Sequence, residues 1–401
     1  MSPLVYNISM STVGIIAEYN PLHNGHKYHL KAAKELSCAK YAVVVMSGDF
    51  VQRGEPAMFD KHIRTKWALQ NGADMVIALP AAFSLASAQA FASAGVNLLR
   101  GTGIVDSIAF GSECGDIFPL KKAAEMLDNE PDELRELIRG NLAEGLSFPD
   151  SRARAVNQLM GVSLLSSPND ILGIEYIRAL NAAGSDMIPL PIPRTGPGHD
   201  SPELTSEFAS ASAIRKHMLA GDDVSAFLPN TVREDISINP RRTQDQLSRE
   251  TVYALRRMSK EQLSALPDVS EGLENLLYSA CRECAHIQDV LEKVKSRRYT
   301  MARLKRICMC ALLGIYGNPM EKLAGLYIRV LGIRKDAMHL LSLLNQSASL
   351  PVIARFSDTD RLNDAQRVLH DIDMLAADIA SLGTPSPLPA PFDYSRPLLI
   401  V

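Results

Sequence analysis

The stretch Val13-Gly-Ile-Ile-Ala-Glu-Tyr-Asn-Pro-Leu-His-Asn-Gly-His-Lys-Tyr-His-Leu30 decides the fold of this chain. Its apolar run 13–17 is typical of a buried parallel strand. Asn20-Pro21 ends that run, and Asn24 is suited to cap a helix that begins near Gly25. The sequence therefore predicts a strand, a short loop and a helix, with polar residues at the start of the helix.

Two histidines, His23 and His26, lie in this loop on either side of Gly25. A helix start has unpaired backbone N–H groups and a dipole that favours anions, so the pattern indicates a phosphate site. A lone loop histidine is ordinarily solvated, but two of them around a glycine favour a ligand. A metal site is disfavoured, because the sequence offers no third ligand nearby. The pattern resembles the His-x-Gly-His signature of the nucleotidyltransferase superfamily, which implies that both histidines hold ATP phosphates.

Composition narrows the class of protein. The chain has 401 residues, 46% hydrophobic and 22% charged, which is enough for two or three domains. A net charge of −3 means that any nucleic-acid binding must rest on a local patch. There is no apolar run of about 18 residues and no signal-like N-terminus, so we expect a cytoplasmic protein with no membrane association. The six cysteines include Cys281, Cys284, Cys308 and Cys310, whose helical surroundings favour reduced thiols over a zinc site.

Further apolar runs indicate a parallel sheet. Residues 41–46, 74–80 and 104–110 are predicted strands that alternate with helical patterns, which is typical of an α/β fold. The segment 187–192 contains prolines, and this favours an edge position. We therefore predict a Rossmann-like domain with a parallel sheet over residues 10–225.

Polar residues that follow these strands are candidate ligand contacts, since open α/β sheets bind ligands at the carboxyl ends of their strands. In the loop after the second strand, Arg53 or Lys61 either meets a phosphate or carboxylate or belongs to a solvated face. Gly111 is either a structural turn or a close approach to a nucleotide. Asn169 either caps a helix or donates to a ribose or phosphate.

A later helix start forms another candidate anion site. Ser210, Ser212 and Arg215 place two hydroxyls and a cation on its first turns, although an ordinary serine-capped helix is the alternative. Arg194 precedes it in a loop rich in glycine and proline. Residues 221–248 are polar and lose periodicity, so we interpret them as the connection to a second region.

The second region, 240–401, is predicted to be mainly helical, with a strand near 350–355. Its most informative segment is 293–306, where Thr300 is suited to cap a helix with a basic face. Such local asymmetry favours a polyanion over a solvated face. The seven cations of the segment are Lys293, Lys295, Arg297, Arg298, Arg303, Lys305 and Arg306.

Together these motifs resemble the bacterial tRNA(Met) cytidine acetate ligase family. The resemblance rests on Gly14-Ile-Ile-Ala-Glu-Tyr-Asn-Pro-Leu-His-Asn-Gly-His26, Met46-Ser-Gly-Asp-Phe-Val-Gln-Arg-Gly-Glu-Pro56, Phe110-Gly-Ser-Glu-Cys-Gly-Asp116, Ser167-Pro-Asn-Asp-Ile-Leu-Gly173, Ser210-Ala-Ser-Ala-Ile-Arg215, and Ser296-Arg-Arg-Tyr-Thr300 with Arg303. It implies acetylation of the wobble cytidine of elongator tRNA(Met) to N(4)-acetylcytidine, with acetate and ATP as substrates and acetyl-adenylate as intermediate. It also implies Mg²⁺ bound through the ATP phosphates.

The resemblance assigns roles by position. His23 and His26 would be catalytic, and no residue is assigned as a metal ligand. Ala211 departs from the superfamily pattern, which commonly carries a hydroxyl there. The residues assigned to ATP are Ile16, Ala17, Glu18, Tyr19, Asn20, Pro21, Leu22, His23, Asn24, Gly25, His26, Lys27, Tyr28, His29, Gly111, Asn169, Arg194, Ser212 and Arg215, with Ser210 beside them.

Two other classes of function stay open at this point. A small-molecule adenylyltransferase would use the same histidines but has little need of the basic segment 293–306. A non-catalytic RNA-binding protein on a nucleotide fold would need the basic segment but not both His23 and His26 beside Gly25.

Overall fold

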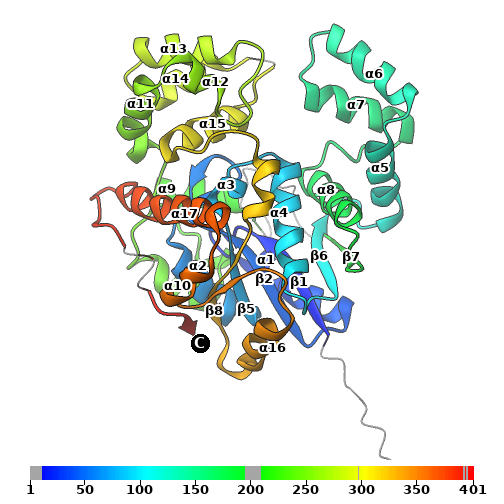
Figure 1. Cartoon of the computed structure of the whole chain (residues 1–401), viewed down its shortest axis with the longest axis vertical. Coiled ribbons are helices and arrows are strands. Elements are labelled where there is room, and N and C mark those ends of the chain that lie inside the picture. The colour runs from blue at the N-terminus through cyan, green and yellow to red at the C-terminus, as the bar shows by residue number, and fades with distance from the viewer. Residues whose placement is uncertain (1–10, 195–208, 297, 392, 394–395) are drawn as a thin grey trace, which may run out of the picture.

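The computed structural model describes residues 11–194, 209–296, 298–391, 393 and 396–401. An eight-stranded sheet lies at the centre of the molecule, with helices on both faces (Figure 1). Its strand order is β10-β8-β5-β2-β1-β6-β7, and β9 also pairs with β8. The strands are β1 Thr12–Ala17, β2 Tyr41–Ser47, β5 Met75–Leu79, β6 Ser107–Ser112, β7 Ile188–Pro193, β8 Ile328–Ile333, β9 Val352–Ile353 and β10 Leu399–Ile400.

The predicted parallel strands are confirmed. β1 pairs in parallel with β2 and β6, and β2 pairs in parallel with β5. Every residue of β2 and β5 is buried, because helices cover both faces, which explains their continuous apolar sequences. β7 lies at the edge of the sheet. Its three prolines have no backbone N–H, and this is tolerated because no further strand lies beyond β7 to need those donors.

Two groups of helices cover the sheet. On one face lie α1 (Asn24–Ser37), α2 (Lys61–Gln70), α9 (Ala211–Ala220) and α10 (Asn230–Ile236). On the other face lie α3 (Ala81–Ser84), α4 (Ala88–Gly101), α8 (Pro168–Ala183), α16 (His339–Ser347) and α17 (Asp364–Leu382). Small residues allow close packing of α4 on the sheet, where a Cβ on Gly95 would meet Cδ1 of Ile16 at 2.5 Å.

Two helical lobes lie at the same end of the molecule in Figure 1. One comprises α5 (Ile117–Asn129), α6 (Asp132–Ala143) and α7 (Phe148–Met160). The other comprises α11 (Ser248–Arg257), α12 (Lys260–Ser264), α13 (Leu273–Glu283), α14 (Ile287–Val294) and α15 (Met301–Leu313). Among the helices of the described ranges, none is long and apolar enough to cross a membrane.

The second region is mainly helical, as predicted, and β9 lies within the strand expected near 350–355, but the region also contributes β8, which was not predicted, and β10. β8 joins the central sheet antiparallel to β5, and β10 pairs with β8. No hairpin signal in the sequence indicates either strand, because each pairs with a strand that is far away along the chain. The segment 221–248, interpreted as the connection, contains α10, which packs on α2. The boundaries 10–225 and 240–401 stay a prediction, but the second range completes the sheet of the first.

The segment after β2 forms a small hairpin of β3 (Phe50–Val51) and β4 (Glu55–Pro56). Gly54 lies in its turn at φ +77°, and a Cβ there would collide with the backbone of Lys305 and Arg306. On its other side the hairpin contacts the end of β1, where the Gln52 N–H donates to Glu18 Oε1 at 2.8 Å. The hairpin therefore lies between the histidine loop and α15.

Candidate active site

His23 and His26 cap the helix α1 that follows β1. The Gly25 N–H donates to His23 Nδ1 at 3.1 Å, and the His23 N–H donates to His26 Nδ1 at 3.3 Å. His23 is therefore the N-cap, and the prediction that Asn24 has this role is wrong. Asn24 already lies within the helix, and its side chain donates to the Ala226 carbonyl at 3.0 Å. A histidine cap was not expected, because Ser, Thr, Asp and Asn are the common caps.

These hydrogen bonds define the tautomer of both rings. Each Nδ1 accepts a backbone N–H, so a neutral ring carries its proton on Nε2. The two rings stack with centroids 3.7 Å apart and planes at 26°, and the Tyr19 ring meets His26 edge-on at 5.0 Å. Tyr19 holds a left-handed backbone conformation, φ 48°, which is costly for a bulky residue and is typical of functional sites. The loop thus presents two imidazole N–H donors at a helix N-terminus.

Arg64 in α2 holds the loop in place. It is fully buried, and it donates to the carbonyls of Glu18 at 2.7 Å, Ser47 at 3.0 Å and Phe59 at 2.9 Å, and to the Gly48 carbonyl. Burial lowers the pKa of its guanidinium to about 10. These bonds connect the carboxyl ends of β1 and β2. No sequence signal indicates this role, because a cation in a polar helix is ordinarily exposed.

Lys61 is also buried, so it does not belong to a solvated face, and the carboxylates that it meets are those of the protein itself. Its ammonium contacts Asp49 at 2.9 Å and Asp393 at 2.7 Å. Arg242 contacts Asp49 at 2.7 Å and Asp60 at 3.0 Å. Burial alone would raise the pKa of Asp49, but Lys61 and Arg242 lower it well below its usual range. Through Asp49 and Asp393, the cluster connects the loop after β2 to the C-terminal part of the chain.

Gly111, His29 and Arg194 come together at the end of β6. Arg194 donates its N–H to the Ser112 carbonyl at 2.9 Å, and its Cγ would lie 3.7 Å from a Cβ on Gly111. His29 of α1 lies beside the end of β6 near Phe110. Burial lowers the pKa of His29 to about 4, and the charge of Arg194 acts in the same direction. The ring is therefore neutral at physiological pH, and its Nε2 is buried without a hydrogen-bond partner.

Asn169 lies near the start of α8, beside the same turn. Its side chain donates to Glu113 Oε1 at 2.7 Å, while the N-cap position belongs to Ser167. Asn169 is therefore not the cap. The neighbouring Asp170 accepts from the Ser112 hydroxyl at 2.5 Å.

The start of α9 lies against the histidine loop. Ser210 caps the helix by accepting the Ala213 N–H at 3.1 Å, and the Ser210 and Ser212 hydroxyls are 3.0 Å apart. Arg215 donates to the Asn20 carbonyl at 2.8 Å. Burial lowers the pKa of Arg215, and Glu55 and Glu18 oppose that shift. The structure thus joins two candidate anion sites that are about 190 residues apart in sequence.

The basic segment has the predicted capped helix, α15 with Thr300 as its N-cap. Most of its described cations already contact neighbouring residues, and Arg297 lies outside the described residues. Arg303 donates to the Asp268 carbonyl at 2.9 Å, and Arg306 contacts the Asp268 carboxylate at 3.2 Å. Lys293 contacts Glu283, Lys305 contacts Glu55, Arg298 lies 4.0 Å from Glu271, and Lys295 is exposed.

A nucleotide-binding α/β sheet with a His-x-Gly-His loop at the start of α1 defines the class. The chain matches the profile of the HIGH Nucleotidyl Transferase family over residues 10–390, and it belongs to that family.

Within the class, the chain belongs with the tRNA(Met) cytidine acetate ligases. The protein of that name from Thermoanaerobacter sp. (strain X514) is 38% identical, over 97% of this chain and 100% of its own length. The one from Acetivibrio thermocellus is 38% identical, over 92% and 94%. The crystal structure of Thermotoga maritima TmcAL bound with alpha-thio ATP superimposes with a TM-score of 0.87 at 30% identity, covering 98% of this chain and all of that one. Its apo form gives 0.90.

Proposed function

We propose that this protein acetylates the wobble cytidine of elongator tRNA(Met) to N(4)-acetylcytidine, with acetate and ATP as the other substrates. The observation that carries the proposal is the stacked pair His23 and His26 at a helix start, in a loop that Arg215 contacts at the Asn20 carbonyl. The names of relatives that match this chain over almost its whole length support the identity of the substrates.

The first step is attack of an acetate oxygen on the α-phosphorus of ATP. A P–O bond to acetate forms, the bond to the β-phosphate oxygen breaks, and pyrophosphate leaves. Negative charge gathers on the phosphorane, and the imidazole donors of His23 and His26 stabilise it. A preorganised donor of this kind is worth roughly 10²–10³ in rate. The start of α9, with Ser210, Ser212 and Arg215, receives the departing pyrophosphate.

The nucleotide lies across the carboxyl ends of β1 and β6. Gly111 offers a surface without a Cβ, and Arg194 and His29 flank it. Asn169, held by Glu113, is placed to donate to the ribose. No group of three His, Cys, Asp or Glu in the described residues is arranged to hold a metal ion. The cationic and hydroxyl-bearing groups here suit the phosphates themselves, so a Mg²⁺ ion would be held through phosphate oxygens and water. That ion would neutralise phosphate charge.

In the second step the exocyclic amine of cytidine attacks the acyl carbon of acetyl-adenylate. A C–N bond forms, the C–O bond to the phosphate breaks, AMP leaves with the electron pair, and the amine loses a proton. Proximity supplies much of the acceleration, because the mixed anhydride is already reactive. The lobe that carries α15 would hold the tRNA, and the hairpin β3–β4 connects that helix to the histidine loop.

The test is incubation of the protein with tRNA, ATP and labelled acetate, followed by analysis of the nucleosides. We expect labelled N(4)-acetylcytidine that requires ATP and forms in elongator tRNA(Met). A small-molecule adenylyltransferase would show ATP–pyrophosphate exchange with another acid and leave the tRNA unlabelled. A non-catalytic RNA-binding protein would bind tRNA without exchange. Either result would refute the proposal.

A further inference from the structure

The second step of the proposed reaction releases a proton. When the cytidine amine attacks acetyl-adenylate, a C–N bond forms and the nitrogen loses one proton to a base. Proton transfer to a positioned side chain typically contributes roughly 10²–10⁴ in rate. A catalytic base therefore has to lie within hydrogen-bond reach of the amine, next to the histidine loop.

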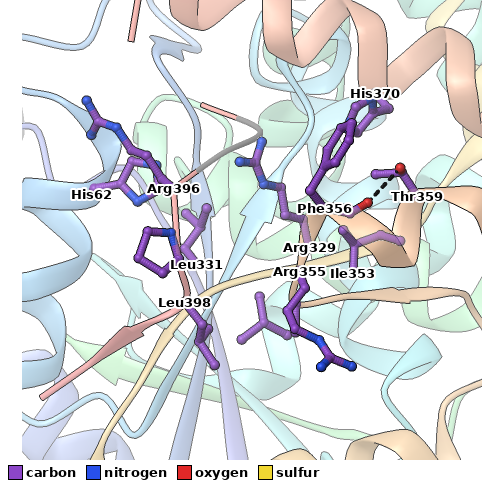
Figure 2. A pocket seen from close by; sticks show the side chains of 13 residues that line it. His62, Arg329, Leu331, Ile353, Arg355, Phe356, Thr359, His370, Arg396 and Leu398 are labelled. Carbon is purple, nitrogen blue, oxygen red and sulfur yellow. Dashed lines mark hydrogen bonds between the residues drawn. The ribbon is translucent and has the colours of Figure 1, made fainter. Parts of the chain in front are cut away.

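The histidines of the described residues near the site are poorly suited to accept this proton. His23 Nδ1 and His26 Nδ1 each accept a backbone N–H, so a neutral ring carries its proton on Nε2 and both of its nitrogens are occupied. The Nε2 atom of His29 is buried within the protein. Figure 2 shows His62 at a separate pocket beside β8, which β5 and β2 separate from β1. Its Nε2 is also bonded to Asp393 at 2.7 Å.

The carboxylates around the site are the remaining candidates, and most of them have fixed partners. Glu55 is paired with a lysine of α15. Both oxygens of Glu113 and both oxygens of Asp170 accept hydrogen bonds. Glu18 differs, because its Oε1 accepts the Gln52 N–H at 2.8 Å while its Oε2 forms no hydrogen bond with the described residues. Glu18 therefore has an oxygen that can accept a proton.

Glu18 is held at both of its ends, so its carboxylate keeps one position. Its backbone carbonyl accepts from Arg64 at 2.7 Å, and the hairpin β3–β4 fixes its Oε1 through Gln52. Such restraint reduces the reorganisation that is needed when a base meets its substrate. A carboxylate repels phosphate, so this side chain suits a proton acceptor better than a contact with ATP.

Groups from three helices lie around the Glu18 carboxylate. Burial raises the pKa of Tyr176 in α8, and the charge of Glu18 raises it further. Burial lowers the pKa of Arg64 in α2 and of Arg215 in α9, and Glu18 is one of the carboxylates that oppose this shift. The carboxylate is therefore within electrostatic reach of the three helices that surround the carboxyl end of β1.

The direction of attack places the acetyl group on the same side as Glu18. Ser210 and Ser212, which are proposed to receive pyrophosphate, lie at the start of α9 on the α1 face of the sheet. In an in-line displacement the attacking and leaving oxygens lie on opposite sides of the phosphorus, so acetate lies toward the other face. Ile16 packs against Gly95 of α4 on that face, and alternate residues of an extended chain share a face. Glu18, two residues after Ile16, follows the same side.

We propose that Glu18 is the general base of the acetyl-transfer step and that its Oε2 accepts the proton of the exocyclic amine of the target cytidine. The amine nitrogen bonds to the acyl carbon, the bond from that carbon to the phosphate oxygen breaks, and AMP leaves with the electron pair. The proton ends on Glu18, which later returns it to water. The proposal rests on the proposed function, because it concerns the second step of that reaction.

The test separates the two steps in Glu18→Gln, which keeps an oxygen for the Gln52 N–H but cannot accept a proton. Acetyl-adenylate is measured by trapping its acetyl group with hydroxylamine, a strong nucleophile that depends little on a base. Acetyl transfer is measured in a single turnover with saturating elongator tRNA(Met). We expect transfer to fall about 100-fold or more, and the ratio of transfer to trapping to fall about 30-fold or more.

Two further variants control this comparison. Glu55→Gln removes a carboxylate from the same hairpin that also acts on Arg215, and its ratio of transfer to trapping should stay within about twofold of the parental ratio. Glu18→Asp keeps a base that is one methylene shorter, so its ratio should fall by only about tenfold. Glu18→Asp also provides the test if the glutamine variant does not fold.

Several results would overturn this inference. A parental ratio in a folded Glu18→Gln or Glu18→Asp would do so. An equal loss of trapping and transfer would also do so, because Glu18 would then hold the hairpin or the nucleotide and would not take the amine proton. Failure of the proposed function is distinct, because the parent protein would then form no hydroxamate from acetate or would leave the tRNA without an acetyl group.

Discussion

His26 has two separable roles, and its substitution distinguishes them. As a cap, its Nδ1 accepts the His23 N–H at 3.3 Å. As a catalytic donor, its Nε2–H stabilises the phosphorane. Loss of a cap costs about 1 kcal/mol, which lowers Tm by about 2 °C or less in a chain of this size. Loss of a transition-state donor costs about 3–4 kcal/mol, or roughly 10²–10³ in rate.

Two variants separate the capping role of His26 from its catalytic role. His26→Ala removes both roles, so we expect a slightly lower Tm and acetate-dependent ATP–pyrophosphate exchange reduced at least 100-fold or so. His26→Gln keeps an acceptor at the third helical position, as in a capping box, but lacks the imidazole donor. It should recover the Tm of the parent while its exchange stays low.

The assay is exchange of labelled pyrophosphate into ATP, with thermal unfolding measured on the same preparations. The reasoning would be refuted by a His26→Gln variant that exchanges at close to the parental rate, since a cap would then be all that His26 supplies. Unchanged exchange in His26→Ala would remove His26 from the catalytic step.

Three further predictions concern the supporting residues. The folded pKa of His29 is about 4, below the ordinary value near 6.5, so the unfolded state binds more protons between these values and stability falls as pH is lowered through them. His29→Asn should reduce this loss of stability by up to about 1.4 kcal/mol per pH unit. The measurement is urea unfolding from pH 7 to about 4.5. Parallel curves of unfolding free energy against pH for variant and parent would contradict the prediction. Arg64→Lys leaves buried carbonyls without donors and should lower the free energy of unfolding by about 3 kcal/mol. The control Lys66→Gln, at a partly exposed position of the same helix, should lower it by less than about 1 kcal/mol. Equal unfolding free energies for the two variants would show that Arg64 does not hold the loop. Lys295→Gln with Arg298→Gln should weaken tRNA binding and lower its salt slope by up to about 2, with Arg257→Gln as control; parental binding of the double variant would place the tRNA platform elsewhere.

Much of the candidate site could be predicted from sequence, because its signals are local. The strand before His23, the helix after it and the cap at Ser210 each depend on residues within a few positions of one another. The roles of the individual residues stay predictions. Their meeting at one edge follows from a general property of parallel sheets, whose carboxyl ends lie together.

Other features depend on contacts that no local pattern announces. Arg64 and Lys61 carry the sequence signature of a polar helix, yet both are buried by distant carbonyls and carboxylates. The cations of the segment 293–306 have the composition of a polyanion platform, but Asp268, Glu55 and Glu283 contact several of them. The sequence could not show this, because each partner comes from another element.

The histidine loop thus depends both on local sequence and on tertiary contacts. The sequence by itself determined the strand, the helix and the presence of two imidazoles at their junction, since hydrophobic period and backbone geometry act over a few residues. Only the structure showed that His23 is the cap and that both Nδ1 atoms accept backbone N–H groups, and only tertiary contacts decided that Arg215 reaches the Asn20 carbonyl in the same loop. It also decided that β8 and β10 complete the sheet, because strand pairing is a long-range interaction.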